Sequence, residues 1–176
     1  MCHAYKEKRM KGIGNKLTVI GVGPGDPACL TLKAKKTLES ATIVFAPTSE
    51  IKGESLALRI ASPFLNKSQI IHELIYPMTR DKTILLEFWN KAGKKVSRFL
   101  HTHKRAVFLT LGDPSVYSTW TYLKNALLME GYSDEDWEII PGISSFSYGA
   151  AVLKKELAIG EKNFCVISMP PSIDSL

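Results

Sequence analysis

Polar side chains follow an apolar run in residues 106–119, AVFLTLGDPSVYST, and this order is typical of a ligand site. The apolar run has the length of a buried strand, and a Gly-Asp-Pro turn ends it abruptly. Apolar residues then recur at helical spacing, which predicts a helix from Val116 onward. Parallel α/β sheets bind ligands at such a turn after a strand. The side chains that this turn would present are Asp113, Tyr117, Ser118 and Thr119.

The same turn has a purely structural interpretation. Asp113 and Ser115 are residue types that cap helices, and Pro114 suits a first helical turn. The spacing alone does not decide between a helix cap and a ligand site.

Two further turns carry residues that let a ligand approach the main chain. A short strand at 17–20 enters GVGPGDP, residues 21–27, where alternate glycines permit a tight turn. A strand at 138–140 enters PGISSFSYGAAV, which presents Ser144 and Ser145 at a helix start, where backbone amides can meet a ligand.

The glycine turn matches a dinucleotide-binding fingerprint poorly. Asp26 stands where the fingerprint requires a glycine, and Pro24 interrupts the motif. Glu50 follows the next predicted strand and could mimic the acid that binds a ribose. Dinucleotide binding therefore stays open as an alternative.

A strand followed by a helix occurs five times, which predicts an α/β fold with a mainly parallel five-stranded sheet and helices on both faces. The predicted strands are 17–20, 42–46, 69–74, 106–111 and 138–140, and helices are expected at 31–40, 56–63 and 81–100. We expect a flexible basic arm at 1–16, an N-terminal α/β domain at 17–160, and a linker and the start of a truncated C-terminal domain at 161–176. Residues 164–168 would form the first strand of this second α/β domain.

The sequence argues against a membrane protein and against a metal-binding protein. No apolar run approaches the roughly 20 residues that span a bilayer, and the N-terminus lacks the apolar core of a signal peptide, so we expect a cytoplasmic protein. The three cysteines, Cys2, Cys29 and Cys165, are far apart, which argues against disulfides and a zinc site. His101 and His103 lack a third ligand nearby, and we expect no metal.

The formal charge of +6 favours an anionic partner. Five of the Lys and Arg residues lie within the first sixteen positions, and a solvated surface accounts for most of the others. No stacking aromatic residues are interleaved with the basic ones, so we expect no nucleic-acid partner.

Three motifs in fixed order, GVGPGDPACLTLKA, LGDPSVYST and IPGISSFS, together resemble the tetrapyrrole methylases, which transfer a methyl group from S-adenosylmethionine. Within that family, GESLALRI at 53–60 and the YST after GDP look most like the precorrin-2 C20-methyltransferases of cobalamin biosynthesis, including the cobalt-factor II form. The resemblance covers residues 17–169 and implies that the first and fourth strands lie side by side.

The resemblance also implies where the ligands bind. The cofactor-binding residues carried over by position are Pro24, Leu111, Gly112, Asp113, Val116, Tyr117, Ser118, Thr119, Ser144 and Ser145. The acidic side chains of a tetrapyrrole suit a basic rim, for which the candidates are Arg59, Arg80 and Lys82. Methyl transfer needs alignment more than acid or base power, so we name no catalytic base. A homodimer is expected.

Two other functions stay open at this point. The wider superfamily includes methylases that act on RNA or on protein side chains. A truncated chain could also be a non-catalytic binding module.

Overall fold

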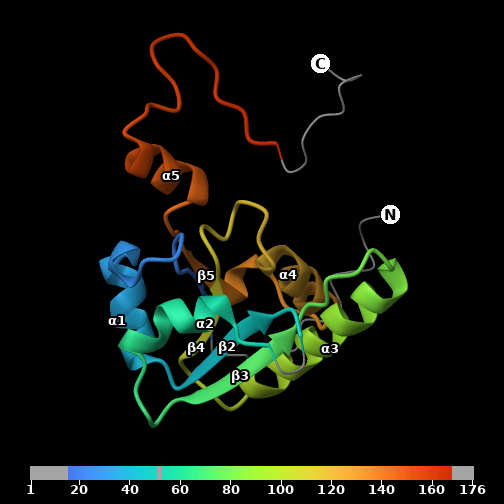
Figure 1. The fold of residues 1–176 in the computed structure, drawn as a ribbon. Coiled ribbons are helices and arrows are strands. Elements are labelled where there is room, and N and C mark those ends of the chain that lie inside the picture. The colour runs from blue at the N-terminus through green and yellow to red at the C-terminus, as the bar shows by residue number, and fades with distance from the viewer. Residues whose placement is uncertain (1–15, 51–52, 168–176) are drawn as a thin grey trace.

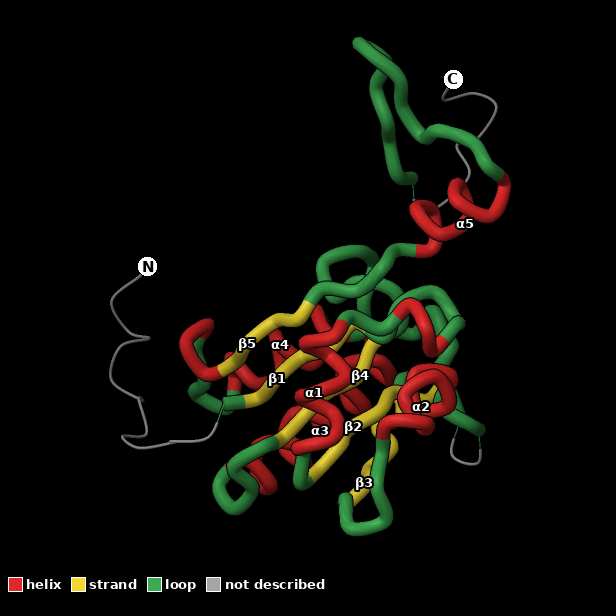
Figure 2. The backbone as a smooth tube through the Cα atoms, turned by 90° about the vertical axis from the view of Figure 1, so that its left-hand side faces the viewer, coloured by secondary structure: helices red, strands yellow, loops and turns green. Residues whose placement is uncertain are grey.

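The computed structural model describes residues 16–50 and 53–167, and it contains one five-stranded sheet (Figure 1). The strands are β1 (Leu17–Gly21), β2 (Ile43–Thr48), β3 (Ile70–Ile75), β4 (Ala106–Thr110) and β5 (Trp137–Ile140). Their order is β3-β2-β4-β1-β5, and every neighbouring pair is parallel. Figure 2 shows the five strands side by side in this order. The predicted parallel sheet and the predicted pairing of the first and fourth strands are confirmed.

The helices alternate with the strands along the chain. They are α1 (Leu32–Ser40), α2 (Leu56–Ala61), α3 (Lys82–Leu100), α4 (Trp120–Met129) and α5 (Ser145–Leu153), with short 3₁₀ turns at Pro27–Cys29, Ser62–Phe64 and Asp134–Asp136. Side chains just before two helices fix where they begin. Thr31 accepts a hydrogen bond from the N–H of Ala34, and Asp81 accepts from Thr83 and Ile84. Threonine and aspartate are residue types that favour this N-cap position.

Two hydrophobic cores lie on opposite faces of the sheet. Phe108 of β4 belongs to the core that includes Val96 of α3 and Leu123 of α4. Its neighbour Leu109 belongs to the other core, with Leu38 of α1 and further residues of α2. Successive strand residues point to opposite faces, so β4 is buried on both. The central strand therefore holds the turn after it on a rigid support.

Two predicted elements differ from the structure. The helix expected from Val116 begins only at Trp120, because the residues between them form turns. The strand expected at 164–168 is not formed over 161–167, where no neighbouring strand supplies a ladder, and Ser168 lies outside the described residues. The second domain stays a prediction. Figures 1 and 2 show α5 and the segment after it projecting beyond the sheet.

Candidate functional site

The turns after β1 and β4 are joined through their main chains at the carboxyl ends of these strands. The N–H of Gly23 donates to the carbonyl of Gly112 at 3.2 Å, and the N–H of Gly112 donates back to Gly23 at 2.9 Å. Val22 N–H also donates to Thr110 at 2.9 Å. The turns after β1 and β4, which are far apart in the chain, thus form one surface.

Glycine is required where these turns meet the turn after β5. A Cβ on Gly21 would lie 2.5 Å from the Gly112 carbonyl oxygen and 2.7 Å from the nitrogen of Gly142. A Cβ on Gly142 would lie 2.7 Å from the Gly21 oxygen and closer still to that of Gly112. We call Gly21, Gly23, Gly112 and Gly142 the glycine cluster. Because glycine has no side chain, the three turns can meet closely at this cluster, and main-chain groups line the surface.

Asp113 links two of these turns through its carboxylate. One oxygen accepts from the N–H of Gly142 at 3.0 Å, and the other accepts from the N–H of Ser115 at 2.8 Å and from the Ser115 hydroxyl. Burial raises the pKa of Asp113, but the hydrogen bonds from Ser115 and Gly142 outweigh it, so the pKa is lowered overall. The carboxylate of Asp113 accepts no hydrogen bond from the N–H groups of α4, which begins at Trp120, so the helix-cap interpretation of Asp113 and Ser115 is wrong.

Ser118 supports the turn from inside. Its side chain is buried, its hydroxyl oxygen lies 2.7 Å from that of Thr110, and it accepts from the N–H of Trp120 at 3.0 Å. The neighbouring Thr119 hydroxyl is buried and has no hydrogen-bond partner among the described residues. Sequence reasoning missed the role of Thr110, because only the folded chain shows which strand residue meets Ser118.

Tyr117 and Leu111 are presented outward from the same turn. Tyr117 has a φ of 45°, a left-handed conformation that is strained for a bulky residue, and its side chain is 69% exposed. Its hydroxyl donates to the carbonyl of Val166 at 3.3 Å. Leu111 is 43% exposed, while Val116 is half-buried. The ring of Tyr117 and the aliphatic side chain of Leu111 are therefore exposed beside the glycine cluster.

The turns after β1 and β5 complete this surface. Pro24 is half-buried, and a Cβ on the next residue, Gly25, would meet nothing within 4 Å, so this part of the turn is open. Ser144 precedes α5 and makes no side-chain cap, while Ser145 is the exposed first residue of the helix. The amides of a first helical turn have no partner within the helix and can bind a ligand.

The predicted basic rim is dispersed. Arg59 lies on α2 and pairs with Glu54 at 3.5 Å, both side chains being exposed. Arg80 lies in the loop after β3, an edge strand that β2 separates from β4, and Lys82 is the exposed first residue of α3. The structure does not bring these three side chains together at the glycine cluster.

The topology argues against the dinucleotide alternative. In the dinucleotide fold the acid that binds the ribose follows the strand beside the glycine turn. Glu50 follows β2, and β4 lies between β2 and β1. The acid is therefore one strand too far from the glycine turn.

Among residues 16–50 and 53–167, no group of three His, Cys, Asp or Glu side chains could hold a metal ion. His72 stacks on Phe45 and tilts against Phe99, whose ring centroid is 4.5 Å away. Cys29 and Cys165 are free thiols, and Cys2 lies outside the described residues. In the same described part of the chain, no helix is long and apolar enough to cross a membrane.

Comparison with known proteins identifies the family. The profile of the Tetrapyrrole (Corrin/Porphyrin) Methylases matches residues 16–175, and this chain belongs to that family. It is 34% identical over 158 residues to a probable cobalt-precorrin-2 C(20)-methyltransferase of Methanocaldococcus jannaschii, covering 90% of this chain and 66% of that protein. It is 32% identical to the cobalt-precorrin-2 C(20)-methyltransferase of Salmonella typhimurium, covering 89% and 64%. The chain thus spans about two thirds of these relatives.

Two solved structures share the fold. The X-ray structure of the cobalt precorrin-4 methyltransferase CbiF aligns with a TM-score of 0.59 and 28% identity, over 86% of this chain and 56% of that one. The uroporphyrin-III C-methyl transferase of Thermus thermophilus, solved with S-adenosyl homocysteine, aligns with a TM-score of 0.52 and 24% identity, over 74% and 46%. Both alignments leave much of the solved chain outside the match.

Proposed function

We propose that this chain forms part of an S-adenosylmethionine-dependent C-methyltransferase that methylates C20 of precorrin-2 or cobalt-factor II in cobalamin biosynthesis. The meeting of three turns in the glycine cluster is the observation that carries the proposal, because the family motifs lie on these turns. Two relatives that are named for this reaction support the choice of substrate.

The cofactor would lie on the glycine cluster. The residues present fit such a group, because main-chain groups line the surface and a Cβ at Gly21 or Gly142 would close it. Pro24, Gly112 and Asp113 would form its floor. Leu111, Val116 and Tyr117 would contact it from the turn after β4, and Ser144 and Ser145 from the start of α5. Ser118 and Thr119 would hold that turn in place.

The cofactor, when bound, supplies an activated methyl group on a sulfonium. That methyl group would pass to C20 by in-line displacement, and a protein group or water would take up the proton that C20 loses. The chain's own residues would orient the two reactants and exclude water, which are effects that can each contribute several kcal/mol. The exposed ring of Tyr117 would cover the reacting groups.

Three basic side chains on separate elements are the proposed contacts for the carboxylates of the substrate. Arg59 is held only by an exposed ion pair with Glu54, which contributes little and can be exchanged for a substrate carboxylate. Arg80, in the loop after β3, and Lys82, at the start of α3, are candidates for the same role. A small tetrapyrrole, rather than a nucleic acid, is the proposed partner, and we propose a homodimer in the cytoplasm.

Titration of the protein with S-adenosyl homocysteine, followed by assay of methyl transfer to precorrin-2 and to cobalt-factor II, tests the proposal. Binding with transfer to C20 is the expected result. If the protein binds the cofactor but methylates RNA or a protein instead, the cofactor site stands and the substrate assignment fails.

A further inference from the structure

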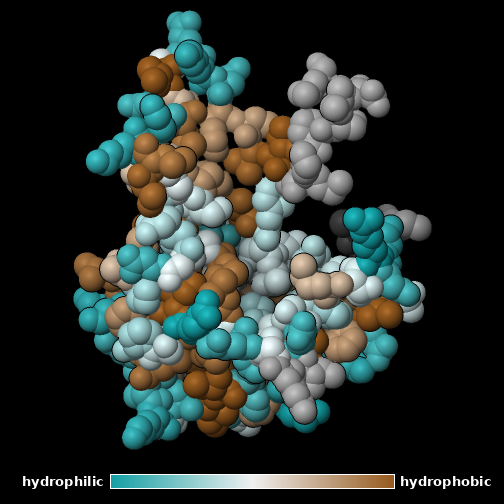
Figure 3. All heavy atoms as spheres, in the orientation of Figure 1, coloured by the Kyte–Doolittle hydropathy of each residue, from teal (hydrophilic) through white to brown (hydrophobic). Residues whose placement is uncertain are grey.

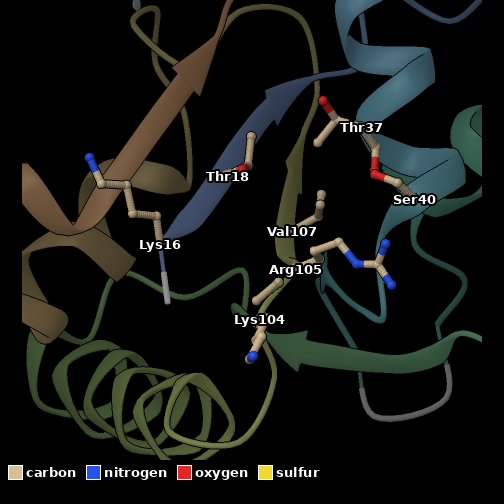
Figure 4. A pocket seen from close by; sticks show the side chains of 8 residues that line it. Lys16, Thr18, Thr37, Ser40, Lys104, Arg105 and Val107 are labelled. Atoms are coloured by element: carbon tan, nitrogen blue, oxygen red, sulfur yellow. The ribbon is translucent and has the colours of Figure 1, made fainter. Parts of the chain in front are cut away.

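The structure contains two adjoining hollows at the end of the sheet opposite the glycine cluster. The smaller, of about 160 Å³, lies between the starts of β1 and β4 and the last turns of α1 (Figure 4). The polar residues that line it are Lys16, Thr18, Thr37, Ser40, Lys104 and Arg105. The larger, of about 530 Å³, shares Lys104 and Arg105 and adds His103 with two threonines. No carboxylate lines either hollow.

Arg105 lies at the centre of this region. Its main chain is fixed, because its carbonyl accepts from the N–H of Thr42 at 2.9 Å. Figure 4 shows its guanidinium extending below Ser40 at the end of α1. Within residues 16–50 and 53–167, neither this guanidinium nor the amines of Lys16 and Lys104 has a carboxylate partner. Three cations therefore surround the smaller hollow without counter-charge.

A helix end can explain a nearby arginine, because the last carbonyls of a helix attract cations. That explanation does not apply to α1. The buried amide of Gln69 donates to the carbonyls of Leu38 and Ala41 at 2.5 and 3.0 Å, and Asn66 donates to the carbonyl of Glu39 at 3.3 Å. The carbonyls of Leu38, Glu39 and Ala41 thus already have side-chain donors, so these three do not need Arg105 as a cap.

The acid beside Thr18 in the sheet is already paired. Glu138 of β5 lies beside Thr18 in the parallel register, and its carboxylate forms an ion pair with Lys33 of α1. The hydroxyl of Thr18 has no hydrogen-bond partner among the described residues and can donate into the hollow. Donors thus outnumber acceptors around it.

From this arrangement we infer that the smaller hollow binds the phosphoryl group of a small phosphorylated anion. Arg105 provides a planar fork of N–H donors that matches a phosphoryl group, and Thr18 adds a hydroxyl donor. In Figure 4 the amines of Lys16 and Lys104 point away from Arg105, but both residues are exposed and free to turn toward an anion. The larger hollow would hold the rest of the ligand.

The dimensions favour a small ligand over a nucleic acid. The smaller hollow encloses one group, and no aromatic side chain lines either hollow to stack on a base, apart from the ring of His103. The site lies a strand length from the glycine cluster, about 16 Å for five residues, so it does not overlap the proposed cofactor site.

Inorganic pyrophosphate is the probe that we would use. Its dissociation constant would be measured by calorimetry at fixed ionic strength, with sodium chloride replacing it in the control. The amide resonances of Thr18 and Val107 would be followed by NMR to locate the site. We expect saturable binding with shifts at both amides, and weakening by at least about tenfold in Arg105→Gln. Arg105→Lys keeps the charge without the fork and should bind with intermediate affinity.

Lys94→Gln is the matched control, because Lys94 is an exposed cation on α3 outside both hollows. Its affinity should stay within about twofold of the unaltered protein. The inference fails if pyrophosphate does no more than the matched chloride, or if Arg105→Gln and Lys94→Gln weaken binding equally. It also fails if a single-stranded RNA displaces pyrophosphate from the protein with a steep dependence on salt, which would define an extended polyanion surface.

Discussion

The carboxylate of Asp113 accepts a hydrogen bond from the main-chain N–H of Gly142 at 3.0 Å and so ties the turn after β4 to the turn after β5. The two residues are 29 positions apart in the chain. A side chain that was predicted as a cofactor contact or a helix cap thus sets the spacing between two turns.

Asp113→Ala should weaken binding of S-adenosyl homocysteine by at least tenfold, about 1.4 kcal/mol, because both turns lose their common acceptor. Asp113→Asn keeps the size but replaces one acceptor oxygen by a donor, and it should lose a large part of this affinity. Calorimetric titration measures the effect, with circular dichroism to confirm folding. Unchanged affinity in a folded Asp113→Ala protein would contradict the proposed site.

Gly142→Ala should destabilise the fold by about 2 kcal/mol or more, because the added carbon would overlap the carbonyls of Gly112 and Gly21. Gly149→Ala is the control, since a carbon added there meets nothing within 4 Å and alanine favours a helix. Its stability should be unchanged or higher. Urea unfolding compares the two variants, and equal stability would show that the three turns are not packed as described.

Stability should fall as the pH drops below about 6.5 because of His72. Burial, with Lys95 and His103 nearby, lowers the pKa of His72 in the folded protein from 6.5. The unfolded chain therefore binds more protons in this range, and stability is lost as the pH falls. His72→Phe should flatten the dependence between pH 7 and 5, while ring contacts with Phe45 and Phe99 are kept. If the free energy of unfolding changes equally with pH in the two proteins, His72 is not the source of the dependence.

The protein should self-associate through its projecting segment. Val152, Leu153 and Ile159 are 63%, 71% and 60% exposed, and Figure 3 shows apolar side chains gathered on the part of the molecule that projects from the sheet. Such exposed apolar surface favours association. Light scattering should show oligomers that Leu153→Glu reduces, whereas Met78→Glu, at a 91% exposed position elsewhere, has no effect. A monomer at all concentrations would refute this.

The elements were predictable where local signals and burial agree. The helix after Asp81 has both a cap and a long apolar stripe, and the burial of β4 on both faces follows from its continuous apolar run. The segment from Asp113 to Thr119 was harder, because the carboxylate of Asp113 bonds Ser115 and Tyr117 adopts a left-handed conformation. These local bonds delay the helix without changing the apolar spacing.

The site was only partly predictable for a different reason. The order of the motifs identifies the turns, but the need for glycine at 21 and 142 depends on a close approach between distant segments. The pairing of Ser118 with Thr110 likewise depends on how the turn folds back on its strand. Neither contact leaves a signal in residue types alone.

The strand order also constrains how the chain can be made. Both neighbours of β1, namely β4 and β5, are synthesised later than every element of the first hundred residues. During translation, the apolar segment of β1 therefore has no hydrogen-bonded strand partner until residues 106–110 have left the ribosome. Pairing between segments so far apart in the chain implies slow nucleation. Until β1 is paired, a chaperone would have access to it on the nascent chain.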